Sequence, residues 1–223
     1  MEWPARTPVT TVTRVDTTDP KDIVRRGYDA VAARYDEAYG SDTKYGPWLG
    51  ELRRLLPPGG TVLDLGCGSG VPVARALTDA GHPVTGVDIS EVQIRRARER
   101  VPGAEFHRAD ITDVAFEAGS FDAVVCFYAL IHLPSAEQPP LLRRVARWLR
   151  PGGRFVATTG HGAWTGVEED WLGGGVPMWW SHTDAAGYRE WITRAGLAVE
   201  REEYVPEGDS GHALFWARKP VSP

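Results

Sequence analysis

Short apolar runs rich in valine alternate with longer amphipathic segments through the middle of the chain. The runs predict strands at 61–65, 84–87, 105–108, 121–127 and 155–159, and the segments between them predict helices at 71–80, 91–100 and 139–149. Beyond these, the pattern predicts a helix at 183–195 and strands at 197–204 and 213–218. Strands that alternate with helices are typical of βαβ units and a mainly parallel sheet. The expected fold is therefore one α/β domain with a seven-stranded sheet.

The two ends of this pattern differ from its middle. Apolar and aromatic positions recur at helical spacing in 22–39 and 44–56, which predicts two cap helices within 19–58. Residues 1–18 have no apolar period and are expected to be flexible. Segment 160–181 reads as a long Gly-rich loop, predicted to be a substrate lid with substrate-binding Trp164, Trp171, Trp179 and Trp180.

Composition narrows the function classes. The 223 residues suit one domain, and a formal net charge of −5 without a basic run disfavours nucleic acid as a partner. No apolar stretch is long enough to span a membrane, and the start of the chain has no export signal. We therefore expect a cytoplasmic monomer or homodimer. The two cysteines, Cys67 and Cys126, lack partners at ligand spacing, so no metal site is expected.

The carboxyl ends of the predicted strands carry the most informative residues. The first strand ends in Asp64, followed by glycines at 66, 68 and 70, which allow backbone to approach a ligand closely. Val71 occupies the position where a dinucleotide fingerprint needs its last glycine, so a nicotinamide cofactor is disfavoured. Asp88 ends the second strand, and its separation along the sequence from the glycines is typical of a ribose-binding carboxylate. Asp110 follows the third strand.

These features, with 121–127 and Leu149–Gly153 in the same order, resemble class I S-adenosylmethionine-dependent methyltransferases over about residues 20–160. The resemblance implies a Rossmann-like fold with helices on both faces of the sheet and an antiparallel last strand. It also implies methyl transfer from S-adenosylmethionine, with S-adenosylhomocysteine as product, to an oxygen or nitrogen, less readily a carbon, of a small molecule. The chain also looks similar to a subgroup of bacterial small-molecule methyltransferases, which suggests natural-product metabolism.

The resemblance further implies a set of cofactor-binding residues. Gly66 and Gly68 would pass the methionine part, Asp88 would hold the ribose, Asp110 and Ile111 would frame the adenine, and Cys126 or Phe127 would offer a carbonyl oxygen. From the first helix, Tyr35, with Tyr28 or Arg34, would reach the methionine end. The complete predicted set is Tyr28, Arg34, Tyr35, Asp64, Gly66, Cys67, Gly68, Asp88, Ile89, Asp110, Ile111, Cys126 and Phe127.

A catalytic base is a separate question, because a hydroxyl acceptor benefits from one whereas a neutral amine does not. His161 follows the fifth strand, and His212 lies near the turn between the last two strands, so both are candidates together with His182. His82, His107 and His132 are expected to be structural. Two alternatives keep the fold: a non-methylating reaction such as cyclisation or decarboxylation, and cofactor binding without catalysis.

Overall fold

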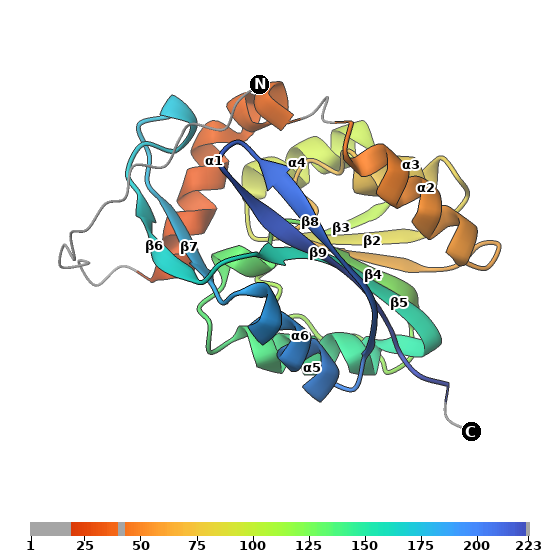
Figure 1. The fold of residues 1–223 in the computed structure, drawn as a ribbon. Coiled ribbons are helices and arrows are strands. Elements are labelled where there is room, and N and C mark those ends of the chain that lie inside the picture. Colours follow the sequence, from red (N-terminus) through yellow and green to blue (C-terminus); the bar gives the residue numbers. More distant parts are fainter. Residues whose placement is uncertain (1–18, 40–42, 222–223) are drawn as a thin grey trace.

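A seven-stranded sheet organises the molecule, and the computed structural model describes residues 19–39 and 43–221 (Figure 1). The strand order is β3-β2-β1-β4-β5-β9-β8. β1 to β5 pair in parallel, while β9 runs antiparallel to both of its neighbours, as predicted. The strands are β1 (Val62–Leu65), β2 (Val84–Asp88), β3 (Glu105–Arg108), β4 (Phe121–Cys126), β5 (Leu149–Gly160), β8 (Ala198–Glu207) and β9 (Ser210–Arg218).

Helices cover both faces of this sheet. On one face lie α2 (Tyr45–Leu55), α3 (Val73–Thr78) and α4 (Glu91–Arg100); on the other lie α5 (Gln138–Trp148) and α6 (Ala185–Arg194) (Figure 1). The central strand β1 is buried throughout. Val62 packs with the core under α2 to α4, whereas Leu63 and Leu65 pack with the core under α5 and α6. Burial on both faces explains the continuous apolar runs of the sequence.

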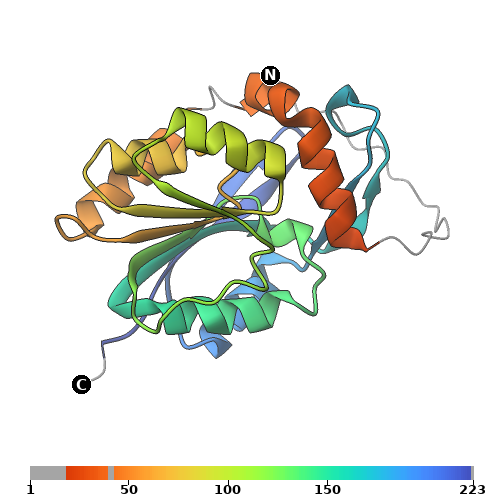
Figure 2. The same ribbon diagram turned by 180° about the vertical axis from the view of Figure 1, so that it is seen from behind.

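Helix α1 (Pro20–Tyr39) crosses the carboxyl ends of the central strands (Figure 2). Polar contacts hold it there: the Ser90 hydroxyl donates to Asp29 over 2.6 Å and the Ser69 hydroxyl donates to Asp36 over 3.1 Å. Because Ser69 follows β1 and Ser90 follows β2, the helix covers the edge where an α/β sheet binds ligands.

The segment predicted as a loop, 160–181, is not a loop. It contains β6 (Trp164–Glu168) and β7 (Met178–His182), which form an antiparallel hairpin, and the short 3₁₀ helix η2 (Trp171–Gly173). Trp171, Met178 and Trp180 from this hairpin pack against Val24 and Val31 of α1. Aromatic and β-branched residues stabilise paired strands, and sequence reasoning missed this because the glycines dominated the pattern.

Two of the expectations from the sequence concern the first residues of the chain and membrane-spanning helices. Residues 1–18, predicted to be flexible, lie outside the described residues. No helix in 19–39 or 43–221 is both long and apolar enough to cross a membrane.

Candidate active site

The turn after β1 brings backbone to the floor of the site. Gly66 and Gly68 adopt φ of +73° and +52°, in the left-handed region that glycine tolerates best. A Cβ on Gly66 would lie 2.3 Å from the Cβ of Ala129, closer than two side chains can approach. Nothing lies within 4 Å of the position of a Cβ on Gly68. The structure thus leaves open space above Gly68, next to a tightly packed Gly66.

Asp88 ends β2 beside this turn and is 9% exposed. Its carboxylate accepts the backbone N–H of Gly68 and that of Ser90, each over 2.9 Å. Burial raises the pKa of Asp88 to about 6, although these two hydrogen bonds favour the charged form. The carboxylate retains lone pairs for further donors, such as the hydroxyls of a bound ligand.

Asp64 lies in the sheet behind Asp88 and is 2% exposed. Burial, followed by the negative charge of Asp88, raises the pKa of Asp64 to about 8. Its side chain is therefore neutral at pH 7, in contrast to an ordinary aspartate.

This shift predicts a pH-dependent effect of Asp64→Asn on stability. The folded-state pKa lies above the unfolded value, so between these two values the Asp64 carboxyl is ionised in the unfolded state but protonated in the native state. The natural protein therefore loses stability as the pH rises toward about 8. The difference in the free energy of unfolding between Asp64→Asn and the natural protein should shift in favour of the variant when the pH is raised from about 5 to about 8. The shift should be at least about 1.4 kcal/mol, the equivalent of one pKa unit. Urea unfolding at both pH values measures the gain. The exposed Asp113→Asn is the control, and an equal gain in that variant would contradict the assignment.

Asp110 follows β3 and forms an ion pair with Lys21 of α1, with 2.6 Å between the Lys21 Nζ and a carboxylate oxygen. Lys21 also pairs with Glu137 at 2.8 Å. Burial opposes ionisation of Asp110, but the hydrogen bonds from Lys21 and Thr112 outweigh it and lower the pKa of Asp110. Sequence reasoning missed Lys21, because its partners lie about 90 and 116 residues away and no local pattern connects them.

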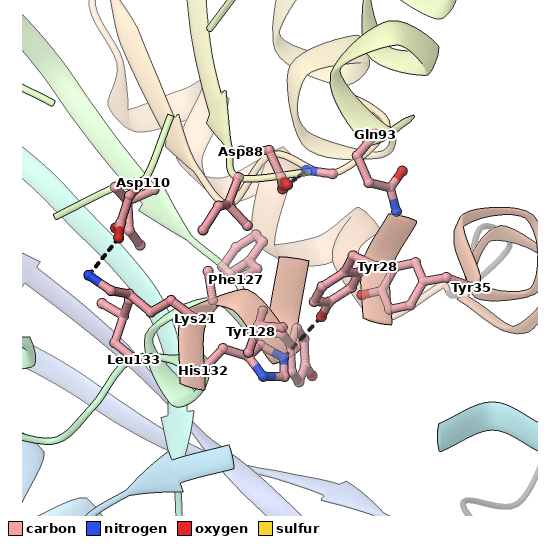
Figure 3. A pocket seen from close by; sticks show the side chains of 16 residues that line it. Lys21, Tyr28, Tyr35, Asp88, Gln93, Asp110, Phe127, Tyr128, His132 and Leu133 are labelled. Carbon is pink, nitrogen blue, oxygen red and sulfur yellow. Dashed lines mark hydrogen bonds and ion pairs between the residues drawn. The ribbon is translucent and has the colours of Figure 1, made fainter. Parts of the chain in front are cut away.

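These strand ends surround a cavity of about 640 Å³, including its open mouth (Figure 3). We call it the cofactor cavity, after the cofactor-binding residues that the sequence predicted. It is lined by Lys21, Val24, Tyr28, Tyr35, Gly66, Gly68, Asp88, Ile89, Gln93, Asp110, Ile111, Phe127, Tyr128, Ala129, His132 and Leu133. Gln93 is fully buried, and neither polar atom of its amide has a hydrogen-bond partner among the described residues. A buried amide without partners is costly unless a ligand satisfies it.

Nine of the predicted cofactor-binding residues therefore line one cavity, and four do not. The guanidinium of Arg34 donates to the carbonyl oxygen of Gly173 over 2.7 Å and so ties α1 to the hairpin. Asp64, Cys67 and Cys126 are buried and do not line the cavity, and Cys126 lies fully buried in the core. The cavity also includes residues that the sequence did not indicate, above all Lys21, Gln93 and Tyr128.

A second cavity of about 320 Å³ adjoins the first, and we call it the aromatic chamber. It is lined by Tyr28, Tyr35, Tyr39, Lys44, Tyr45, Tyr128, His132, Trp171, Trp180 and Glu207. Tyr28, Tyr35, Tyr128 and His132 line both cavities. The hairpin supplies Trp171 and Trp180, whereas Trp164 and Trp179 are not among the chamber residues.

The His132 ring lies beside Tyr28 in the lining of the cofactor cavity (Figure 3), and His132 also lines the aromatic chamber. Its Nδ1 lies 2.7 Å from the carbonyl oxygen of Trp179, which can only accept, so Nδ1 carries the proton. Nε2 then accepts from the Tyr28 hydroxyl at 3.0 Å. Burial lowers the pKa of His132 to about 4, with the Trp179 hydrogen bond acting in the opposite direction. The ring is thus a neutral group that fixes Tyr28.

The three histidines predicted as bases occupy different places. His182 and His212 line a third cavity of about 590 Å³, the outer cavity, together with Gly162, Ala163, Trp164, Glu207, Ser210 and Gly211. His161 is exposed, packs 4.7 Å from the ring of Tyr204, and lines none of the three cavities. Within the described part of the chain, no group of three His, Cys, Asp or Glu side chains could hold a metal ion.

The sheet order, the glycine turn after β1 and the carboxylates at Asp88 and Asp110 agree with the resemblance to class I methyltransferases seen in the sequence. Residues 62–153 match the family model described as "Methyltransferase domain". This segment, which is less than half of the chain, is thus similar to the methyltransferase domain family, in agreement with the resemblance seen in the sequence.

Among individual proteins, the chain is similar to 27-O-demethylrifamycin SV methyltransferase of Amycolatopsis mediterranei (strain S699). The two are 35% identical over 155 residues, which cover 60% of this chain and 56% of the relative. The chain thus spans little more than half the length of this relative.

Two solved structures show the same fold across most of the chain. The 1,6-didemethyltoxoflavin-N1-methyltransferase of Burkholderia thailandensis superposes with a TM-score of 0.73 and 18% identity, covering 93% of each chain. The cyclase SpnF superposes with a TM-score of 0.69 and 21% identity, covering 89% of this chain and 95% of that one. At these identities the similarity concerns the fold alone.

Proposed function

We propose that the protein transfers the methyl group of S-adenosylmethionine to a hydroxyl oxygen of a small, planar molecule bound in the aromatic chamber. The observation that carries this proposal is the shared wall of Tyr28, Tyr35, Tyr128 and His132. Because these four residues border both cavities, a molecule in the chamber would lie next to the cofactor cavity. Proximity of this kind can contribute about 7–11 kcal/mol to a bimolecular reaction.

The cofactor cavity has groups that fit S-adenosylmethionine. Open space above Gly68 leaves room for the methionine part, and Asp88 offers a carboxylate to the ribose hydroxyls. Ile89 and Ile111 supply apolar contacts for the adenine, while Asp110 supplies an acceptor for its amino group. The unpaired amide of Gln93 adds both a donor and an acceptor. When bound, the cofactor supplies an electrophilic methyl group.

The residues of the chamber favour a planar acceptor. Tyrosine and tryptophan rings stack well on flat apolar surfaces, and Trp171 and Trp180 close the chamber from the side of the hairpin. We therefore assign residues 160–181 the role of a cap over the acceptor, with Trp171 and Trp180 in contact with it. The relative from Amycolatopsis is named for a methyl group on an oxygen, which supports a hydroxyl as the acceptor group.

The proposal is tested by calorimetry and product analysis. Titration with S-adenosylmethionine should release heat at one site per chain. Incubation with the cofactor and a panel of phenols and hydroxylated polycycles should then yield S-adenosylhomocysteine together with O-methylated product. Product without S-adenosylhomocysteine would instead indicate a non-methylating reaction, N-methylated product alone would refute the choice of oxygen, and binding without turnover of any compound would refute catalysis of this class.

A further inference from the structure

Tyr128 has an unusual backbone conformation where the two inner cavities meet. Its φ is +58°, in the left-handed region that costs a non-glycine residue about 1–2 kcal/mol. Its backbone N–H donates to the Thr158 hydroxyl over 2.5 Å, which helps to hold this conformation. The Tyr128 side chain lines both the cofactor cavity and the aromatic chamber. Strained residues of this kind concentrate at functional sites, so the contacts of the Tyr128 hydroxyl are informative.

The Tyr128 hydroxyl donates to Glu207 at the end of β8 over 2.5 Å. The same carboxylate accepts from the Lys44 ammonium over 2.6 Å, and its other oxygen lies 3.2 Å from the Nδ1 of His212. The Glu207 side chain is 11% exposed and lines both the aromatic chamber and the outer cavity. Burial opposes its ionisation, but His212 and Lys44 outweigh this effect and lower the pKa of Glu207 to about 2. Glu207 is therefore a carboxylate in the resting protein, and it borders two cavities.

His212 on β9 completes a connected path. It is 7% exposed and lines the outer cavity, and its ring lies 4.9 Å from that of Tyr128. Tyr128, Glu207 and His212 thus join the wall of the cofactor cavity to the outer cavity through consecutive contacts. Residues from the end of β4 and from the two last strands form this path, which crosses three separate segments of the chain.

Methyl transfer to a hydroxyl releases a proton inside the aromatic chamber, and the other histidines are poorly suited to take it. The Nδ1 of His132 is committed to Trp179 and its Nε2 to Tyr28, and the low pKa of this ring makes it a weak base. His161 lies outside all three cavities, and His182 lines only the outer one.

We propose that Tyr128, Glu207 and His212 form a proton relay that deprotonates the acceptor hydroxyl and carries its proton to the outer cavity. This inference rests on the proposed function. As the O–CH₃ bond forms and the S–CH₃ bond breaks, the acceptor proton passes to the Tyr128 oxygen while the Tyr128 proton moves to Glu207 and on to the Nδ1 of His212. The sulfonium becomes a neutral thioether and the imidazole becomes an imidazolium, so the total charge is conserved.

The surroundings of the relay are compatible with this end state. The imidazolium would lie beside the Glu207 carboxylate, which compensates its charge. Other ionisable groups act on two members of the relay. Lys44, which precedes α2, acts on Glu207. Tyr35 of α1 and Tyr45 of α2 act on Tyr128. His132 interacts electrostatically with His212. His182 lines the outer cavity together with His212. None of these groups adds a second carboxylate that would compete for the proton.

The test compares two phenols of different acidity. At a pH where 4-nitrophenol is ionised and 4-methoxyphenol is not, Glu207→Gln and Tyr128→Phe should lower methylation of 4-methoxyphenol by about 10²–10⁴-fold. Methylation of 4-nitrophenol, which needs no base, should fall by less than about 10-fold. The controls are Glu203→Gln and Tyr204→Phe on the same strand, since both side chains are substantially exposed and line none of the three cavities.

A second measurement needs no turnover. The visible absorbance of 4-nitrophenol bound to the cofactor-free protein reports its ionisation, which should require a higher pH in His212→Gln than in the natural protein. Equal losses with both phenols, or an unchanged absorbance titration in the folded His212→Gln variant, would overturn the relay, as would failure of 4-nitrophenol to bind. If the natural protein binds no S-adenosylmethionine, the proposed function fails first, and calorimetry separates that outcome from failure of the relay.

Discussion

Replacing Asp88 with alanine should weaken the binding of S-adenosylhomocysteine by about 100-fold or more. We assign this buried carboxylate to two ribose hydroxyls, and hydrogen bonds to a charged group contribute about 1.5–3 kcal/mol each. Two such bonds correspond to about two decades in affinity. Calorimetry measures the change. Asp113→Ala, at an exposed carboxylate outside the cavity, is the control and should bind like the natural protein.

Asp88 should also make the binding of S-adenosylhomocysteine depend on pH. Burial raises the pKa of Asp88 to about 6, so its carboxylate takes up a proton as the pH falls through that value. A protonated carboxyl accepts hydrogen bonds less well, and affinity for S-adenosylhomocysteine should decline below about pH 6 in the natural protein. Asp88→Asn has no such titration and should lose this part of the dependence. Affinity unchanged in Asp88→Ala, or an identical pH profile in Asp88→Asn, would show that the ribose binds elsewhere.

Gly66→Ala should lower the free energy of unfolding by about 2–5 kcal/mol. The left-handed backbone costs about 1–2 kcal/mol for a residue with a Cβ, and that Cβ would overlap Ala129 at 2.3 Å, an overpacking that costs about 1–3 kcal/mol. Chemical denaturation measures the loss. The double variant with Ala129→Gly should recover the part that comes from the overlap, since only the backbone strain then remains.

Gly68→Ala is the matched comparison. Its φ is also positive, but no atom lies within 4 Å of the added Cβ, so only about 1–2 kcal/mol of stability should be lost. The methyl group would instead project into the space assigned to the cofactor, and affinity for S-adenosylhomocysteine should fall by more than about 10-fold in the folded protein. Equal stability losses in the two glycine variants, or no recovery with Ala129→Gly, would contradict the packing described for Gly66.

One part of the site was predicted from the sequence and another part was not. The residues at the ends of β1, β2 and β3 were predicted, because each follows an apolar strand directly and parallel strands bring their carboxyl ends to one edge. The roles assigned to them remain predictions. Lys21, Gln93 and Tyr128 were not predicted, because each reaches the cavity only through the packing of a helix or a turn.

The hairpin shows a similar division. The tryptophans of 160–181 indicated an ordered segment, but not which of them would face a ligand. Pairing of Trp164 with His182 and of Gly166 with Trp180 sets the register of β6 and β7. That register, together with packing against α1, places Trp171 and Trp180 at the aromatic chamber and Trp164 at the outer cavity.

The sequence by itself determined the strands of the sheet and the glycine and carboxylate positions at the strand ends, while the antiparallel last strand was expected only from the resemblance. The strands follow from local periodicity, and the glycine positions follow from the conformational freedom of glycine. Both signals are present in short stretches of the sequence. The tertiary structure alone decided that Tyr128, Glu207 and His212 meet. Their contact requires β8 and β9 to pair beside β5 and the chain to turn sharply after β4, and such long-range packing leaves no periodic signal along the chain.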